Sequence, residues 1–358
     1  MKRIESLDYL RGVMALTIML YHYTSWTLGN LGGDSLLGKL GIYGVAIFYI
    51  LSGASLTIAY QGKISAITDI KSYAAKRFFR IAPLFWLVVT ITLLLIYIKC
   101  RLDGTAFNVS SYIIFLNYSL LFGFIDPTAY FSTGAWSIGN EIVFYAIFPF
   151  ILIATKYNHK LIWPIFILSI AIGLFFALHF LDKTTSLANQ WHIYVNPFNQ
   201  LFLFIGGISI VIFSQKYRHL IFERLPLACM LVGIIFFYTF PGDADNISLV
   251  SGLGRIILSV ACILFVFGMI NHHIKTPKPL ARILTFLGEH CYSIYLLHPI
   301  VAIPVVSVIA HFGGSKLIAY IISACLTFIL SAFTFKYIET PMISYGSRIS
   351  KKISIRTT

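Results

Sequence analysis

The first apolar segment of the chain carries charged and titratable side chains that favour proton-transfer chemistry inside a membrane. The segment LDYLRGVMALTIMLYHY contains Asp8, Arg11 and His22. Eleven helical steps of about 100° return Arg11 and His22 to one face, roughly 16 Å apart along the axis. Because histidine titrates near neutral pH, His22 is predicted to act as a general base from a cavity beside this helix.

Arg11 and His22 each have a structural interpretation as well. Arg11 either shares a cavity with His22 or lies at the membrane interface and pairs with Asp8. His22 lies too deep to reach interfacial water, so its alternative role is a contact between packed helices. Ionisable groups are costly inside a membrane, which makes each of them a candidate for function.

A second polar stripe runs through the segment TGAWSIGNEIVFYAIFPF. Ser137, Glu141 and Tyr145 recur every four residues, which places them on one helical face beside Asn140. Polar groups at this depth must face a water-filled cavity or another protein group. The expected partner of Glu141 is His22 or a second intramembrane arginine, which is Arg255 in the segment 249–271.

Two motifs near the C-terminus add further polar groups. In GEHCYSIYLLHPIV, Tyr295 and His298 share a helical face and are predicted to line the same cavity or to pack between helices. In KYIETPMISYG, Glu339 precedes Pro341. We interpret this second motif mainly as a helix stop with an ion pair to Lys336.

A basic cluster occurs in KSYAAKRFFRIAPLFW. Arg77 and Arg80 are three residues apart and share a helical face, and Lys76 lies alongside. Guanidinium groups bind phosphates bidentately, so this cluster is predicted to receive a phosphate-bearing ligand. The alternative is an anchor on anionic lipid.

The composition predicts the elements that must position these groups. Of 358 residues 58% are hydrophobic and 11% charged, which excludes a soluble domain and leaves no solvated basic face for nucleic acid. We expect an all-α polytopic membrane protein with about ten transmembrane helices, and an interfacial or re-entrant segment at 106–125. The predicted spans are 8–28, 40–60, 81–99, 136–155, 161–181, 197–214, 226–240, 249–271, 291–311 and 316–337.

The distribution of basic residues predicts the orientation. With the N-terminus in the cytoplasm, 20 of the 27 Lys and Arg residues fall on the inner side and 5 on the outer side, while Arg11 and Arg255 lie within spans. Both termini are therefore expected in the cytoplasm, with the protein in the cell (inner) membrane. The five cysteines lack CxxC spacing, and no metal site is expected.

Taken in order, these segments resemble the membrane-bound acyltransferase-3 family. The similarity is carried by six motifs, with Tyr49, Ile50 and Ile138 departing from the common residues: SLDYLRGVMALTIMLYHY, GIYGVAIFYILSGASL, KRFFRIAPLFW, TGAWSIGNEIVFY, YSIYLLHPI and YIETP. The matches extend from residue 5 to about 341. We accordingly predict an acyltransferase-3-like transmembrane domain over residues 1–345 and a basic cytoplasmic tail over residues 346–358.

The resemblance implies an enzyme. Members of the family transfer acetyl or other acyl groups from cytoplasmic acyl-CoA to glycans such as O-antigen, exopolysaccharide, peptidoglycan or Nod factor. It implies acetyl-CoA as the donor substrate and a glycan or lipid-linked glycan as the acceptor. We expect the chain to act by itself or with a separate extracytoplasmic partner. The sequence specifies no oligomeric state.

The resemblance also suggests roles for individual residues. His22 is expected to act as general base or as a covalent acyl relay. Arg11 would hold a CoA phosphate or the thioester carbonyl, Glu141 or Asp8 would orient cationic groups, and Arg77, Arg80 and Lys76 would bind the CoA phosphates.

Two other functions fit the same intramembrane residues. A proton-coupled secondary transporter could use His22, Glu141 and Arg255 as a relay, but it gives no reason for a paired-arginine site at the cytoplasmic face. A non-catalytic polysaccharide-export subunit is the other alternative. Stabilisation of the protein by CoA or acetyl-CoA would favour the transferase.

Overall fold

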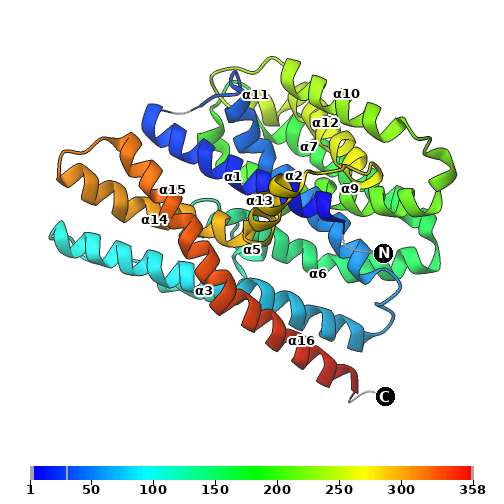
Figure 1. Ribbon diagram of the computed structural model, residues 1–358, viewed down its shortest axis with the longest axis horizontal. Coiled ribbons are helices and arrows are strands. Elements are labelled where there is room, and N and C mark those ends of the chain that lie inside the picture. Colours follow the sequence, from blue (N-terminus) through cyan, green and yellow to red (C-terminus); the bar gives the residue numbers. More distant parts are fainter. Residues whose placement is uncertain (1–3, 30, 356–358) are drawn as a thin grey trace. The chain divides into compact units, whose positions relative to one another are not determined.

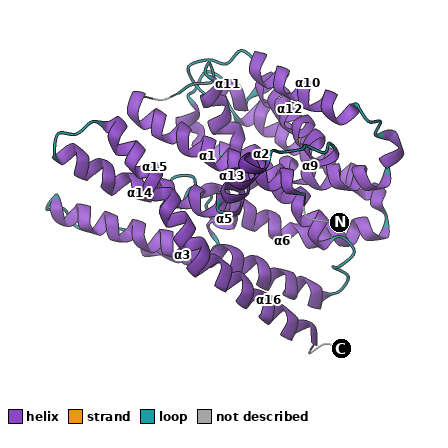
Figure 2. Cartoon of the chain, in the orientation of Figure 1, coloured by secondary structure: helices purple, strands orange, loops and turns teal. Residues whose placement is uncertain are grey.

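The computed structural model describes residues 4–29 and 31–355, and over these residues the protein is helical with no strand (Figure 2). The all-α prediction is therefore confirmed. Lys2, Arg3 and Arg356, which contribute to the predicted charge asymmetry, lie outside the described residues.

Eight helical segments of the described chain have the length and apolar composition needed to cross a membrane. They coincide with eight of the ten predicted spans, and the protein is a multi-pass membrane protein. The eight are α2 (Leu36–Tyr60), α3 (Ile67–Leu102), α6 (Trp136–Tyr157), α7 (Ile162–Phe175) with its flanking turns, α9 (Pro197–Lys216), α12 (Gly252–Asn271), α14 (Cys291–His311) and α15 (Lys316–Thr334) continuing into α16 (Thr340–Ile355).

The other two predicted spans are also helices. α1 (Glu5–Leu28) has 24 residues, or about 36 Å, but its first two turns carry Glu5, Asp8 and Arg11. α10 (Leu225–Thr239) has 15 residues and covers only about 22 Å. The remaining α-helices are short or lie between spans: α4 (Ser111–Tyr118), α5 (Phe122–Ile125), α8 (Trp191–Tyr194), α11 (Ile247–Val250) and α13 (Lys278–Glu289). α4 and α5 are too short to span, in agreement with the interfacial segment predicted at 106–125.

The prediction that the helix ends at Pro341 is wrong. The chain continues from α15 through a π-helical turn, Phe335–Glu339, directly into α16. The wider turn accommodates the hydrogen bond that Pro341 cannot donate. Pro341 lies beyond the predicted span 316–337, and the packing of α16 against α3 supports the continued helix. α16 also runs without a break through residue 345, where the predicted tail begins.

The basic cluster lies inside a helix and not before one. α3 begins at Ile67 and has 36 residues, so it is about 54 Å long against a hydrocarbon thickness of about 30 Å. Its first turn is capped by Asp69, whose carboxylate accepts from the backbone N–H groups of Ser65 (2.7 Å) and Ala66 (2.8 Å). Arg77 and Arg80 are therefore held by regular helix.

The described residues fall into two compact units. Unit 1 comprises residues of the ranges 1–64 and 147–291, and unit 2 those of 65–146 and 292–358. In unit 2, α16 packs along the first half of α3 (Figure 1). Ser72 contacts Ser350 and the ring of Phe79 meets that of Tyr345 at 5.1 Å, so the two helices run antiparallel.

In unit 1, glycines bring α2 close to two neighbouring helices. On one side Gly53 of α2 lies against the backbone of Phe204 in α9, and Gly207 of α9 lies against the backbone of Ile50. On the other side Gly44 lies against Ile18 of α1. This close packing holds α1, the helix that carries Arg11 and His22, in register with α2.

Candidate active site

The predicted stripe on α1 exists, and its middle faces protein. Arg11, Ala15, Ile18 and His22 follow one another at helical spacing on an uninterrupted helix. Ala15 and Ile18, which lie between the two titratable residues, are buried at 0% and 1% exposure. Arg11 and His22 are half-buried. The middle of the stripe therefore faces the interior of the molecule, and its two ends are partly exposed.

α2 covers this stripe in a one-to-one antiparallel register. Arg11 contacts Leu51, Ile18 contacts Gly44 and Tyr21 contacts Gly41, so each step forward along α1 matches one step back along α2. A side chain at Gly41 or Gly44 would displace α1. The glycines of the GIYGVAIFYILSG motif thus allow the close approach that positions the candidate site.

Arg11 is held by two acceptors. Its Nη2 donates to the backbone carbonyl of Leu51 at 3.2 Å, and its Nη1 lies 3.5 Å from a carboxylate oxygen of Asp8. The pair with Asp8, one of the two predicted interpretations, is present but long. The shorter contact is to α2, which directs the guanidinium across the helix pair.

His22 is oriented by aromatic neighbours. Its imidazole is stacked on the indole of Trp26, one turn later, with ring centroids 5.3 Å apart and planes at 7°. The ring of Tyr21 lies 5.4 Å from the imidazole, centre to centre, with the ring planes tilted by 49°. Stacking restricts the ring plane of His22 and so defines the directions in which its two nitrogens point.

Arg255 is bound by neutral groups of α9. The side chain is 1% exposed, and its Nη2 donates to the side-chain oxygen of Gln200 at 2.8 Å and to the backbone oxygen of Asn199 at 3.0 Å. Its guanidinium carbon lies 5.0 Å from the ring centre of Phe202. These contacts fasten Arg255 to α9 within unit 1, and the predicted pairing of Glu141 with His22 or Arg255 stays a prediction.

Unit 2 contains the predicted polar stripe of α6. Tyr145 donates to Glu141 at 3.1 Å, which confirms that these residues share a helical face. Ser137 lies 2.9 Å from the hydroxyl of Tyr295, which also donates to the backbone carbonyl of Gly134 at 2.8 Å. Asn140 is fully buried. The start of α6 is thereby fastened to α14 within this unit.

His298 follows Tyr295 by one turn on α14 and is fully buried, with ring centroids 6.2 Å apart. The Nδ1 atom of His298 lies 3.0 Å from the backbone carbonyl of Ile294. This contact is satisfied when Nδ1 carries the proton, which leaves Nε2 as the acceptor nitrogen. His298 thus shares the environment predicted for it beside Tyr295.

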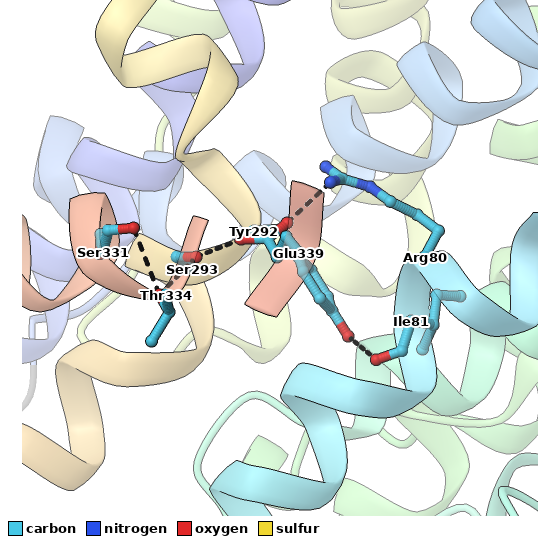
Figure 3. A network of polar contacts seen from close by, with 7 residues as sticks. All are labelled: Arg80, Ile81, Tyr292, Ser293, Ser331, Thr334 and Glu339. Carbon is cyan, nitrogen blue, oxygen red and sulfur yellow. Dashed lines mark hydrogen bonds and ion pairs between the residues drawn. The ribbon is translucent and has the colours of Figure 1, made fainter. Parts of the chain in front are cut away.

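The third group of polar residues joins α3 to the C-terminal helices of unit 2 (Figure 3). Arg80 Nη1 lies 2.7 Å from a carboxylate oxygen of Glu339, and Ser293 donates to the other oxygen of the same carboxylate. Thr334 lies 3.0 Å from Ser293. The prediction of an ion pair between Glu339 and Lys336 is therefore wrong. The Nζ atom of Lys336 lies 5.1 Å from the centre of the Tyr337 ring.

The remaining members of the basic cluster, Lys76 and Arg77, are half-buried on the same helix as Arg80. Arg80, the third predicted phosphate-binding residue, forms the ion pair with Glu339 described above. Among residues 4–29 and 31–355 no group of three His, Cys, Asp or Glu side chains is arranged to hold a metal ion.

Sequence reasoning missed the role of Glu339 and of Ser293. Both belong to motifs noted in the sequence, but their contacts join positions 259 and 46 residues apart. One signal was available: Glu339 and Arg80 are opposite charges at the predicted inner ends of two spans. Such ends lie at the same depth in the membrane and can meet.

The protein is an all-α multi-pass membrane protein with titratable residues on the inner faces of its helices. These features are typical of a membrane-embedded enzyme or transporter. Comparison with known proteins decides between them. Residues 4–336 match the acyltransferase-3 family, described as an acyltransferase domain, and the chain belongs to this family.

Relatives of the chain occur in Staphylococcus aureus. The chain is 25% identical over 370 residues to O-acetyltransferase OatA of strain NCTC 8325, a match that covers 96% of this chain and 58% of OatA. It is 24% identical over 381 residues to SACOL0978 of strain COL, provisionally named an O-acetyltransferase, covering 97% and 58%. The chain thus spans less than three fifths of the length of these relatives. No solved structure matches the chain significantly.

Proposed function

We propose that the chain is a membrane O-acyltransferase that moves an acetyl group from cytoplasmic acyl-CoA to a hydroxyl group of a cell-surface or secreted glycan. Membership of the acyltransferase-3 family and the relatives named O-acetyltransferases support the reaction class. The bilayer in question is the cell (inner) membrane, and the acceptor is a glycan or a lipid-linked glycan.

The depth of the basic cluster supports a donor that arrives from the cytoplasm. About twenty helical residues cross the hydrocarbon layer. If Lys316 marks the outer boundary on α15, the inner boundary lies twenty residues later, at Lys336. If Lys99 marks the outer boundary on α3, the inner boundary lies twenty residues earlier, at Phe79. The Arg80–Glu339 pair joins these two levels. The phosphates of acyl-CoA would bind at this inner boundary, while the thin pantetheine arm enters the membrane.

The observation that carries the proposal is the half-buried imidazole of His22 on an inward-facing stripe of α1. As general base, His22 takes the proton of an acceptor hydroxyl while that oxygen attacks the thioester carbonyl. The carbon–sulfur bond breaks, the CoA thiolate leaves, and the acyl group is bonded to the acceptor oxygen. In the relay variant the imidazole carries the acyl group between donor and acceptor.

The spacing along α1 supports a separate task for Arg11. Arg11 lies roughly 16 Å from His22 along the helix axis, which favours a contact with a CoA phosphate over one with the thioester carbonyl that reacts beside His22. Its position nearer the cytoplasm fits contact with the donor before the thioester reaches the imidazole. In this view Arg11 binds the entering donor and His22 performs the chemistry.

The donor can be tested with purified protein in detergent. Acetyl-CoA and CoA are expected to raise the Tm of the wild-type chain, since a ligand that binds the folded state stabilises it. Arg77→Ala is expected to reduce that increase. A wild-type Tm that neither compound changes would contradict the acyl-CoA donor and favour a transporter or an export subunit.

A further inference from the structure

Glu339 is a buried carboxylate whose two oxygens are both occupied. One oxygen accepts from Ser293 of α14, and the other lies 2.7 Å from Arg80 Nη1 on α3. The side chain of Glu339 is 1% exposed, whereas that of Arg80 is 30% exposed. A buried carboxylate keeps its charge only when it is paired and hydrogen-bonded. One carboxylate oxygen of Glu339 is therefore held by Ser293, and the other oxygen is held by Arg80.

The π-helical turn and α14 together fix this carboxylate. The turn Phe335–Glu339 sets the direction of the Glu339 side chain, and Thr334, just before the turn, lies 3.0 Å from Ser293. The hydroxyl of Thr334 can donate to Ser293, which in turn donates to Glu339 (Figure 3). π-Helical turns are frequent at functional sites, where they re-aim a side chain.

Arg80 is held on a second side by Tyr292. Its guanidinium carbon lies 5.6 Å from the centre of the Tyr292 ring, and the hydroxyl of Tyr292 donates to the backbone carbonyl of Ile81 at 2.9 Å. One nitrogen of the planar guanidinium is thus bound to Glu339 and one face lies near an aromatic ring. The Arg80 side chain is 30% exposed, and a guanidinium bound to one carboxylate oxygen has further N–H donors that can bind phosphate.

We propose that Glu339 is a positioning residue for Arg80: it holds the guanidinium so that its further N–H donors are presented to a phosphate group of the acyl-CoA donor. The inference rests on the proposed function, which supplies the phosphate-bearing ligand. Holding a flexible side chain in place before binding is worth about two- to tenfold in affinity. The negative charge of Glu339 lowers the net positive charge near the phosphate, so the proposal requires that the gain from positioning exceeds this opposing effect.

Isothermal titration calorimetry of the full chain in detergent tests the proposal with two probes. CoA carries the phosphates, and acetyl-pantetheine carries none. We expect Glu339→Gln to weaken CoA binding about fivefold and to leave the Kd for acetyl-pantetheine unchanged. The glutamine keeps an acceptor for Ser293, so the helix packing is retained. A purely structural role would weaken the binding of both probes or of neither.

A double-mutant cycle shows whether Glu339 acts through Arg80. Arg80→Met is expected to weaken CoA binding more than Glu339→Gln does, and the double variant should bind CoA no more weakly than Arg80→Met alone. The control is Lys336→Gln, one turn before Glu339, which should leave both Kd values unchanged. Independent, additive effects, or a Glu339→Gln variant with wild-type affinity for CoA, would overturn the proposal. If the wild-type chain binds CoA no better than acetyl-pantetheine, the proposed function itself fails.

Discussion

The close contact between α2 and α9 can be tested by adding one atom, the Cβ of an alanine at Gly207. An added Cβ at Gly207 would lie 2.9 Å from the backbone nitrogen of Ala54 and closer still to the carbonyl oxygen of Ile50. The obstructing atoms are backbone atoms of α2, so relief requires the two helices to separate. Gly207→Ala therefore overpacks this crossing, which costs about 1–3 kcal/mol.

The neighbouring residue provides a matched control on the same helix. A Cβ at Gly206 would lie 3.4 Å from the ring of Phe166 and 3.5 Å from the side chain of Ile263, which is ordinary contact. Both substitutions gain up to about 1 kcal/mol of helix propensity. The net expectation is a loss of about 1–2 kcal/mol for Gly207→Ala and no loss for Gly206→Ala.

The assay is thermal unfolding of the two variants in detergent, followed by intrinsic fluorescence. A loss of 1–2 kcal/mol corresponds to a Tm lower by about 2–6 °C. Gly206→Ala should have a Tm at or above that of the wild type. Equal Tm values for Gly207→Ala and Gly206→Ala would refute the close backbone contact and, with it, the account of how α2 is held beside α9.

Two further predictions concern unit 2. Arg77→Ala should raise the KM for acetyl-CoA about tenfold with little change in kcat, because a charged contact to phosphate is lost; an unchanged KM would indicate that Arg77 anchors the protein on lipid. Tyr295→Phe removes a hydroxyl that bonds both Gly134 and Ser137, and it should cost about 1 kcal/mol, seen as a lower Tm. If Tyr295→Phe lowers the Tm of the wild type but not that of the Ser137→Ala variant, the two hydroxyls act as one unit.

Periodicity predicted the parts of the molecule that depend on local chain geometry. The shared face of Arg11 and His22 and the pairing of Tyr145 with Glu141 both follow from 3.6 residues per turn, and the structure contains both. The spans themselves follow from apolar length. These features require no knowledge of which helices are neighbours.

The features that were not predicted depend on which helices are neighbours. Arg80 pairs with Glu339, 259 residues away, and no local pattern encodes that contact. Amide and carbonyl oxygens of Gln200 and Asn199 accept hydrogen bonds from Arg255, and the sequence around Arg255 does not reveal them. Pro341 was interpreted by the local rule that proline ends a helix, but the chain continues through a π-helical turn into α16, which packs along α3.

The central claim is that His22 performs the acyl transfer. Its most direct test is mass spectrometry of surface glycans from cells that produce either the wild-type chain or His22→Ala at equal levels in the membrane. The account predicts that O-acetylated glycan is present with the wild-type chain and absent with His22→Ala, while the variant keeps the wild-type Tm. Acetylated glycan at wild-type abundance in cells producing His22→Ala would contradict it.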